Sequence, residues 1–192
     1  MQPVLPAQHD VVMPSFDSVA QLPVKLLAYI GDGVYELWAR YAVLEGLSEE
    51  IPYHGKGLPW EALTTLTNQD VQGIHRRVTQ FTQGSFQAHI LSVLLNVPTT
   101  TTLAEKASPS GLQNPLVPTW SLTEEERALV KRFLNTHHKG TRHKKHDQTS
   151  VRQATALEAL IGYWHMKGYH QRLYGFWSWV KCYTQTVKGL ES

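Results

Sequence analysis

The sequence has little of what marks secreted and membrane proteins. It holds a single cysteine, Cys182, which excludes an internal disulfide and fits a reducing compartment. No apolar run approaches the ~20 residues of a membrane-spanning helix, and residues 1–20 lack the charged and apolar segments of a secretory signal. We therefore expect a cytoplasmic protein without a membrane partner. A thiol nucleophile is disfavoured because nothing places a histidine near Cys182.

The chain also lacks the alternating pattern of β-strands and any internal repeat. Its 192 residues, 42% hydrophobic and 18% charged, suffice for one domain with a core. Apolar residues recur at helical spacing instead, which predicts an all-α fold. Residues 1–20, with three prolines and no helical periodicity, are expected to form a mobile leader, and residues 21–190 the folded domain.

Six segments have helical patterns. The expected helices cover about 23–45, 60–79, 85–95, 123–135 and 149–167, with a last one after Gly168. In the first, the stripe expected to face the core is Leu26, Ile30, Val34, Leu37, Tyr41 and Leu44, and Gly46 is expected to end the helix. Residues 96–120, with four prolines and a threonine run, are expected to be a mobile loop insertion that is dispensable for folding.

The first helix carries an acidic residue between two glycines, in the stretch "IGDGVYELWAR". A glycine inside a helix costs about 1 kcal/mol relative to alanine. Asp32, Glu36 and Arg40 lie on a stripe opposite the apolar one, so a solvated face with a Glu36–Arg40 pair is one interpretation. The other is a site, because small residues beside an acid admit a neighbouring backbone, a hydrated metal ion or a phosphate.

A second acid, Glu158, lies at the edge of an apolar stripe in "RQATALEALIGYW". A carboxylate at that boundary is costly unless it is paired or bound to a cation. A salt bridge to Arg152 or Lys25 would satisfy it. Alternatively, Glu158 and Asp32 converge across packed helices and bind a hard divalent cation through oxygen atoms and water, for which Mg²⁺ is suited.

Three segments together resemble a known family. In order, "LAYIGDGVYELWAR", "LTEEERALVKRFLN" and "ALEALIGYWHMKG" are similar to the signature helix, a middle segment and the second acidic motif of the ribonuclease III superfamily, in the form called Mini-ribonuclease III. The similarity spans about residues 21–185. The absence of a double-stranded-RNA-binding domain after the last helix is expected of that form.

The resemblance implies a function. It implies an all-helical endonuclease domain that forms a homodimer, with the signature helices contributing to the dimer, and that cuts one RNA strand at each protomer's site. The reaction would be Mg²⁺-dependent hydrolysis of double-stranded RNA (Mn²⁺ being an alternative ion) that leaves 5′-phosphate and 3′-hydroxyl ends, in maturation of a large-subunit ribosomal RNA precursor. Asp32 and Glu158 would be the catalytic residues and metal ligands, with Glu36 an outer-shell candidate.

The sequence departs from the superfamily pattern at several positions. Lys25, Ala28 and Thr155 stand where conventional ribonuclease III has further carboxylates, and Gly33 replaces an alanine. These departures leave the number of metal ions open. They also motivate the alternative hypothesis, a non-catalytic RNA-binding or ribosome-associated protein on the same fold.

Basic charge is concentrated in residues 131–146, which hold six Lys or Arg residues, four histidines and no acid. A-form RNA is bound largely through phosphates and 2′-hydroxyls, so this stretch predicts an RNA contact; a solvated basic loop is the alternative. The RNA-binding candidates are Lys131, Arg132, Lys139, Arg142, Lys144 and Lys145, with Asn135 matching the family asparagine. The histidine spacing fits no zinc pattern, and the His-Asp pairs at 9–10 and 146–147 are too scattered for a metal phosphohydrolase.

Overall fold

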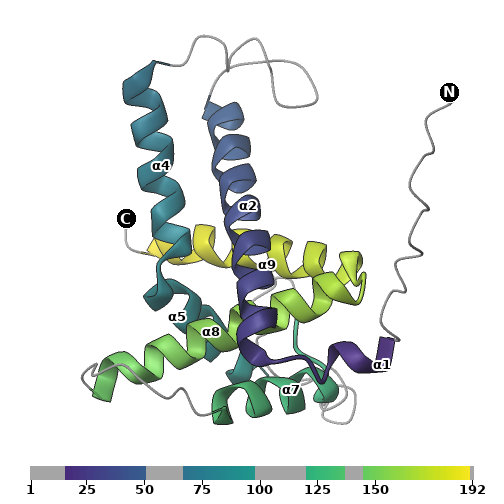
Figure 1. The fold of residues 1–192 in the computed structure, drawn as a ribbon. Coiled ribbons are helices and arrows are strands. Elements are labelled where there is room, and N and C mark those ends of the chain that lie inside the picture. Colours follow the sequence, from purple (N-terminus) through teal and green to yellow (C-terminus); the bar gives the residue numbers. More distant parts are fainter. Residues whose placement is uncertain (1–15, 51–66, 98–119, 137–144, 191–192) are drawn as a thin grey trace, which may run out of the picture.

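The computed structural model describes residues 16–50, 67–97, 120–136 and 145–190, and within these ranges it contains helices and no strand (Figure 1). The predicted all-α class is confirmed. The helices are α1 Phe16–Val19, α2 Val24–Glu50, α4 Asn68–Thr82, α5 Gly84–Asn96, α7 Glu124–Asn135, α8 Lys145–Met166 and α9 His170–Leu190. No helix in these ranges is long and apolar enough to cross a membrane.

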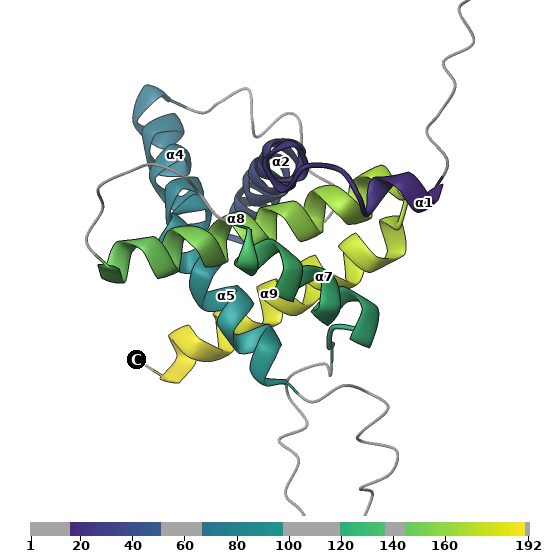
Figure 2. The same ribbon diagram turned by 60° about the horizontal axis from the view of Figure 1, so that its bottom comes forward.

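Helix α8 is the centre of the fold and packs against α2, α5, α7 and α9. Figures 1 and 2 show it crossing α2, with α5 and α7 on its other side. Its inner face is completely buried, as Leu157, Leu160 and Trp164 illustrate, and the aromatic rings of Phe176 and Trp177 from α9 complete the core. Burial of this apolar surface is the main term that stabilises the fold.

Local sequence signals set several helix boundaries. Thr67 and Asp70 form a capping box at the start of α4, and Thr123 and Glu126 form another at the start of α7. Thr123 is one of the two residues that the sequence offers as the N-cap of α7, the other being Ser121. Gly168, with φ of +68°, follows the end of α8, a conformation that glycine adopts without strain. Helix α4 thus starts later than predicted, and residues 60–66 lie outside the described ranges.

A buried ionic cluster fixes α7 and α9 against α8. The carboxylate of Glu126, only 6% exposed, accepts hydrogen bonds from Trp164 Nε1 and from Arg172 Nε, each at 2.8 Å. The Arg172 guanidinium also lies 4.0 Å from the ring centroid of Trp120. Because a buried charge is tolerated only when it is paired and hydrogen-bonded, this cluster constrains how the three helices pack.

Two expectations for the first helix are wrong. Gly46 does not end α2, which continues to Glu50, because one glycine costs a continuing helix only about 1 kcal/mol. The predicted core stripe is also not the buried face: Leu26, Leu37 and Tyr41 are 44%, 51% and 49% exposed. Its remaining members, Ile30, Val34 and Leu44, are half-buried. The face that packs on the rest of the chain carries Leu27, Ala28, Gly31, Tyr35 and Ala39 instead.

The last residues of the predicted leader and the last residue of the predicted insertion are part of the folded domain. Val19, in α1, is buried in the main core, and Trp120 packs against it. Residues 1–15 of the predicted leader and 98–119 of the predicted insertion lie outside the described residues, so their mobility and dispensability stay predictions.

Candidate active site

Two glycines allow α2 and α8 to touch backbone to backbone. A Cβ atom added at Gly31 would lie 1.8 Å from the carbonyl oxygen of Glu158, and one added at Gly162 would lie 2.0 Å from that of Leu27. Both distances are far inside van der Waals contact, so no side chain fits at either position. Gly31 therefore admits another backbone, as one of our interpretations had it, and that backbone is α8 of the same chain.

This crossing places Asp32 beside Glu158. Asp32 lies on the exposed edge of α2, and Glu158 is half-buried on α8. Burial, and after it the negative charge of Asp32, raises the pKa of Glu158 from 4.5 to about 7. Partial burial and the charge of Glu36 raise the pKa of Asp32 as well. The charge of Asp32 thus disfavours the charged form of Glu158, which places the two carboxylates close to each other.

The salt bridge that would have explained Glu158 structurally is absent. Among the residues that the structure describes, neither Lys25 nor Arg152 pairs with it, and both are exposed. Within that part of the chain, neither Asp32 nor Glu158 therefore forms a salt bridge with a cationic side chain. Two neighbouring carboxylates are stabilised either by protonation of one of them or by a bound cation.

The donor set fits a hydrated magnesium ion. No group of three or more His, Cys, Asp or Glu side chains is placed to hold a metal within the described ranges, so Asp32 and Glu158 would supply the protein's ligands there. Mg²⁺ usually keeps several water molecules and takes only one or two carboxylates. The absence of acids at Lys25, Ala28 and Thr155 is therefore compatible with a metal site.

The shared charge predicts a pH dependence of stability. Since folded Glu158 binds its proton more tightly than the unfolded chain does, the free energy of unfolding in EDTA should fall as pH rises from about 4.5 to about 7. We expect the Glu158→Gln variant to lack this decrease. Urea unfolding of both proteins across that range measures it, and parallel curves for the two would contradict the prediction.

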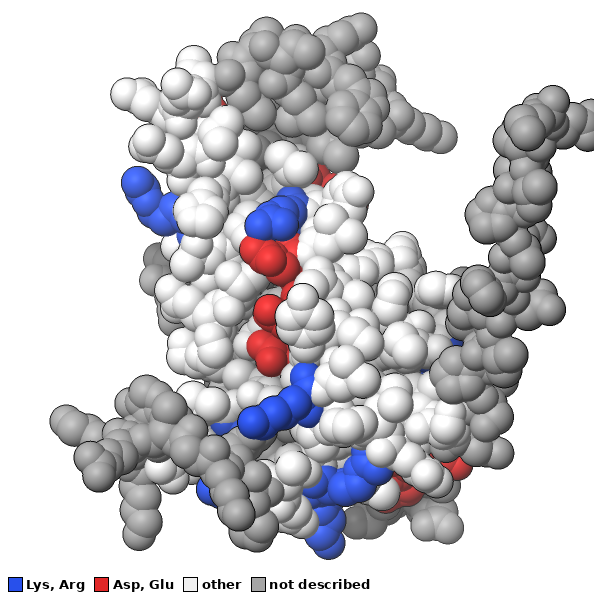
Figure 3. Space-filling model, viewed as in Figure 1, with Lys and Arg blue, Asp and Glu red and all other residues white. Residues whose placement is uncertain are grey.

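Glu36 completes a row of acids but has a partner. Its Oε1 atom accepts a hydrogen bond from an Arg40 guanidinium nitrogen at 2.6 Å, and both side chains are about half exposed. Figure 3 shows the acidic side chains aligned on one face, with basic side chains directly above and below them. The predicted Glu36–Arg40 pair exists, and an outer-shell role for Glu36 stays a prediction.

The RNA-binding candidates are described only in part. Lys131, Arg132 and Asn135 lie exposed near the end of α7, and the Arg132 guanidinium lies 5.0 Å from the ring centroid of Phe133. These side chains belong to α7, which packs directly against α8, the helix that carries Glu158. The remaining candidates, Lys139, Arg142, Lys144 and the side chain of Lys145, lie outside the described residues.

Sequence analysis missed two polar side chains that are buried near Glu158. Gln87 of α5 is 2% exposed and Tyr35 of α2 is completely buried. Burial, and after it the charge of Glu158, raises the pKa of the Tyr35 hydroxyl. Gln87 could have been found, because it lies one turn before Ile90 and Leu91 on the apolar face of its helix. Tyr35 carries no such signal, since tyrosine is ordinary in a core.

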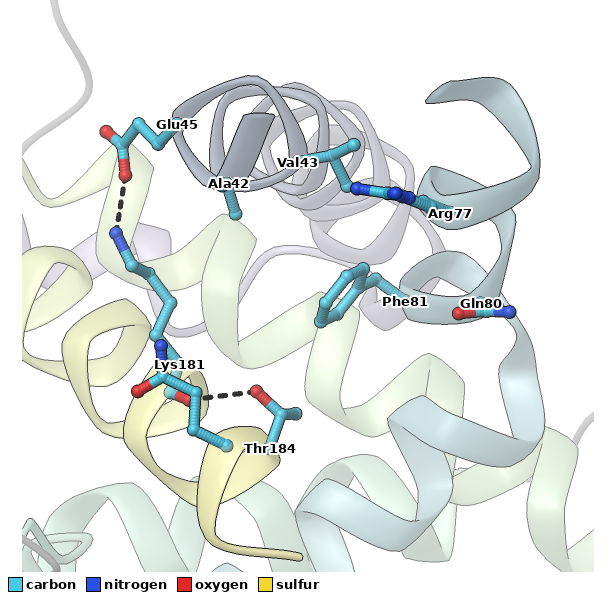
Figure 4. Close-up of a pocket in the computed structure, with 10 residues that line it drawn as sticks. Ala42, Val43, Glu45, Arg77, Gln80, Phe81, Lys181 and Thr184 are labelled. Carbon is cyan, nitrogen blue, oxygen red and sulfur yellow. Dashed lines mark hydrogen bonds and ion pairs between the residues drawn. The ribbon is translucent and has the colours of Figure 1, made fainter. Parts of the chain in front are cut away.

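A pocket of about 380 Å³ lies apart from the acidic pair, between α2, α4 and α9 (Figure 4). Phe81 and Arg77 reach it from α4, and Lys181 of α9 pairs with Glu45 of α2 at its rim. Neither Asp32 nor Glu158 lines it. The pocket is therefore not part of the candidate active site.

The region of this chain that is similar to known proteins includes both acids of the candidate site. The model of the family described as "Ribonuclease III domain" matches residues 25–169, which include both acids. Mini-ribonuclease 3 of Desulfitobacterium hafniense is 29% identical over 147 residues, which are 77% of this chain and 64% of the relative. Mini-ribonuclease 3 of Enterococcus faecalis is 26% identical over 159 residues, 83% and 88% of the two chains. The fold is similar to a crystal structure of a Fusobacterium nucleatum protein, with a TM-score of 0.51, 17% identity, and 90% and 97% coverage of the two chains.

Proposed function

The chain belongs to the ribonuclease III domain family, and we propose that it is an endoribonuclease that hydrolyses double-stranded RNA and leaves 5′-phosphate ends. The similarity to Mini-ribonuclease 3 proteins supports this activity. The observation that carries the proposal is the pairing of Asp32 and Glu158 across the Gly31–Gly162 crossing, without a salt bridge to a cationic side chain in the described residues.

Asp32 from α2 and Glu158 from α8 would hold the metal ion between the two crossing helices. A bound Mg²⁺, or Mn²⁺ in its place, would supply an activated water and offset negative charge on the scissile phosphate. Glu158 approaches from the core side and Asp32 from solvent, so the open side of the pair is where RNA would reach it. The exposed position of Asp32 is what leaves room for a phosphate.

Basic side chains of α7 would hold the RNA backbone. Lys131, Arg132 and Asn135 are exposed beside α8, and Lys139, Arg142, Lys144 and Lys145 follow in the chain. Phosphate contacts of this kind position the duplex and carry no sequence information. We propose a ribosomal RNA precursor, from the large subunit, as the natural substrate, and the cytoplasm as the location.

The activity is tested by incubating the purified protein with a long double-stranded RNA in Mg²⁺ or in EDTA. We expect strand scission with 5′-phosphate ends in Mg²⁺ and intact RNA in EDTA. The alternative, a non-catalytic RNA-binding protein, is favoured by the small number of carboxylates at the site. It predicts binding without scission in either condition, so the appearance of metal-dependent products would reject it.

We propose further that the protein is a homodimer joined through α2. The apolar stripe of Leu26, Leu37 and Tyr41 is exposed in the single chain although the helix is central to the fold. Gly33 is also exposed, and a Cβ atom there would meet nothing within 4 Å. A second copy of the chain would cover this face, and Gly33 would allow its backbone to come close to α2.

The Leu37→Asp variant tests the dimer. We expect the wild-type protein to sediment as a dimer and Leu37→Asp as a monomer, because an unpaired charge in an apolar interface is costly. Circular dichroism should show unchanged helix content, since Leu37 is half exposed in the single chain. Val71→Asp on α4, where Val71 is similarly exposed, is the control that should remain a dimer. Sedimentation of the wild type as a monomer would contradict the proposal.

A further inference from the structure

Helix α5 packs against α8 beside Glu158. A Cβ atom at Gly84 would lie 3.7 Å from the Cβ atom of Ala154, which is ordinary van der Waals contact. Gln87 lies about one turn after Gly84 on α5, and Glu158 lies about one turn after Ala154 on α8. The two helices thus meet near Gly84 and Ala154, and Gln87 and Glu158 each lie about one turn further along their own helix.

Gln87 is buried with an unused donor. Its side chain is 2% exposed, yet its Nε2 atom has no hydrogen bond of ordinary geometry among the described residues. The hydroxyl of Tyr35, on α2, is likewise buried without a hydrogen-bond partner among the described residues. A buried donor left unpaired costs about 1–3 kcal/mol, so an amide at this position is unfavourable unless it does something that an apolar residue cannot.

The acceptor within reach of Gln87 is the carboxylate of Glu158. Hydrogen bonding from the Gln87 amide favours the charged carboxylate and opposes the effect of burial on the pKa of Glu158. No other side chain contributes a hydrogen bond to this shift. The amide thus lies beside the carboxylate, close enough to stabilise its charge but without a hydrogen bond of ordinary geometry.

We propose that Gln87 is a positioning residue for Glu158, donating from Nε2 to one carboxylate oxygen so that the other oxygen faces the cation held with Asp32. This inference rests on the proposed function, because it assigns Gln87 to the same site. Partners that orient a metal ligand from behind typically change metal affinity by about 10- to 100-fold when they are removed. Gln87 would not touch the metal or the RNA.

The Gln87→Met variant tests the proposal, because methionine is similar in size and has no donor. We expect it to weaken Mn²⁺ binding by about 10- to 100-fold in isothermal titration calorimetry. Its free energy of unfolding in EDTA should change little, because the Nε2 atom makes no hydrogen bond of ordinary geometry among the described residues. Gln80→Met, at an exposed glutamine of α4, is the matched control and should bind Mn²⁺ like the wild type.

A second measurement covers the case in which Gln87→Met does not fold. In the ¹⁵N-labelled wild-type protein, Mg²⁺ should shift the side-chain amide resonances of Gln87 and leave those of Gln80 in place. Unchanged Mn²⁺ affinity in a folded Gln87→Met variant, or unshifted Gln87 resonances on Mg²⁺ saturation, would overturn the proposal.

The metal-binding result is separate from the test of the endonuclease. If the wild type cleaves RNA and Gln87→Met binds Mn²⁺ normally, the positioning role fails and the endonuclease stands. If the wild type does not cleave RNA but Gln87→Met loses Mn²⁺ affinity, the positioning role stands and the proposed reaction fails.

Discussion

Asp32→Asn and Glu158→Gln should each lower the rate of Mg²⁺-dependent RNA cleavage by at least about 10²-fold. Losses of this size follow when one group that stabilises charge in a transition state is removed, and here each acid would be half of the protein's metal ligand set. Both substitutions keep the size of the side chain. In EDTA, Glu158→Gln should not lose stability, because it removes a half-buried charge that burial and Asp32 disfavour.

Glu45→Gln is the matched control for these two variants. Glu45 is an exposed acid on the same helix as Asp32, paired with Lys181 and more than three helical turns beyond Asp32 in the sequence. We expect its cleavage rate to stay within about twofold of the wild type, since an exposed ion pair contributes little. Single-turnover cleavage of one labelled duplex compares all four proteins. Undiminished cleavage by both Asp32→Asn and Glu158→Gln would refute the assignment of the site.

The two glycines that flank Asp32 should respond in opposite ways to alanine. Gly31→Ala forces a methyl group to within 1.8 Å of the Glu158 carbonyl oxygen, and forced overpacking costs about 1–3 kcal/mol or more. The helices must separate, which also moves Asp32 away from Glu158. Gly33→Ala meets no atom within 4 Å and should raise the free energy of unfolding by up to about 1 kcal/mol.

These effects are best measured by urea unfolding in a Leu37→Asp background, so that association through α2 does not contribute. We expect Gly31→Ala to be the least stable protein of the set and Gly33→Ala to be at least as stable as its parent. Equal destabilisation by both substitutions would show that the close crossing at Gly31 is not what the fold depends on. In the wild-type background, Gly33→Ala should weaken the proposed dimer, because its methyl group projects from the exposed face.

The helices were largely predictable because their signals are local. Thr123 with Glu126, and Gly168 after α8, combine residue type and spacing in ways that define helix ends. The pairing of Asp32 with Glu158 was also anticipated, from the cost of an acid at a core boundary and from the family resemblance. Catalysis by these two residues remains a prediction that the geometry supports.

The orientation of α2 was not predictable from its periodicity. The helix has two apolar faces, one with Leu27 and Tyr35 and one with Leu26 and Leu37, and the pattern does not say which meets the same chain. Gly31 determines which face of α2 packs on α8, because only a residue without a Cβ atom can lie against the backbone of α8 there. Its partner Gly162 is far away in the sequence, so the crossing emerges only once the helices are packed.

The most direct test of the account is a double-mutant cycle on divalent-metal binding by Asp32 and Glu158. Mn²⁺ titrations of the wild type, Asp32→Asn, Glu158→Gln and the double variant give the free energy by which the two acids depend on each other. If both hold one ion, each single variant loses most of the affinity and the double variant loses little more. Strictly additive losses, or wild-type affinity in either single variant, would contradict a shared metal site.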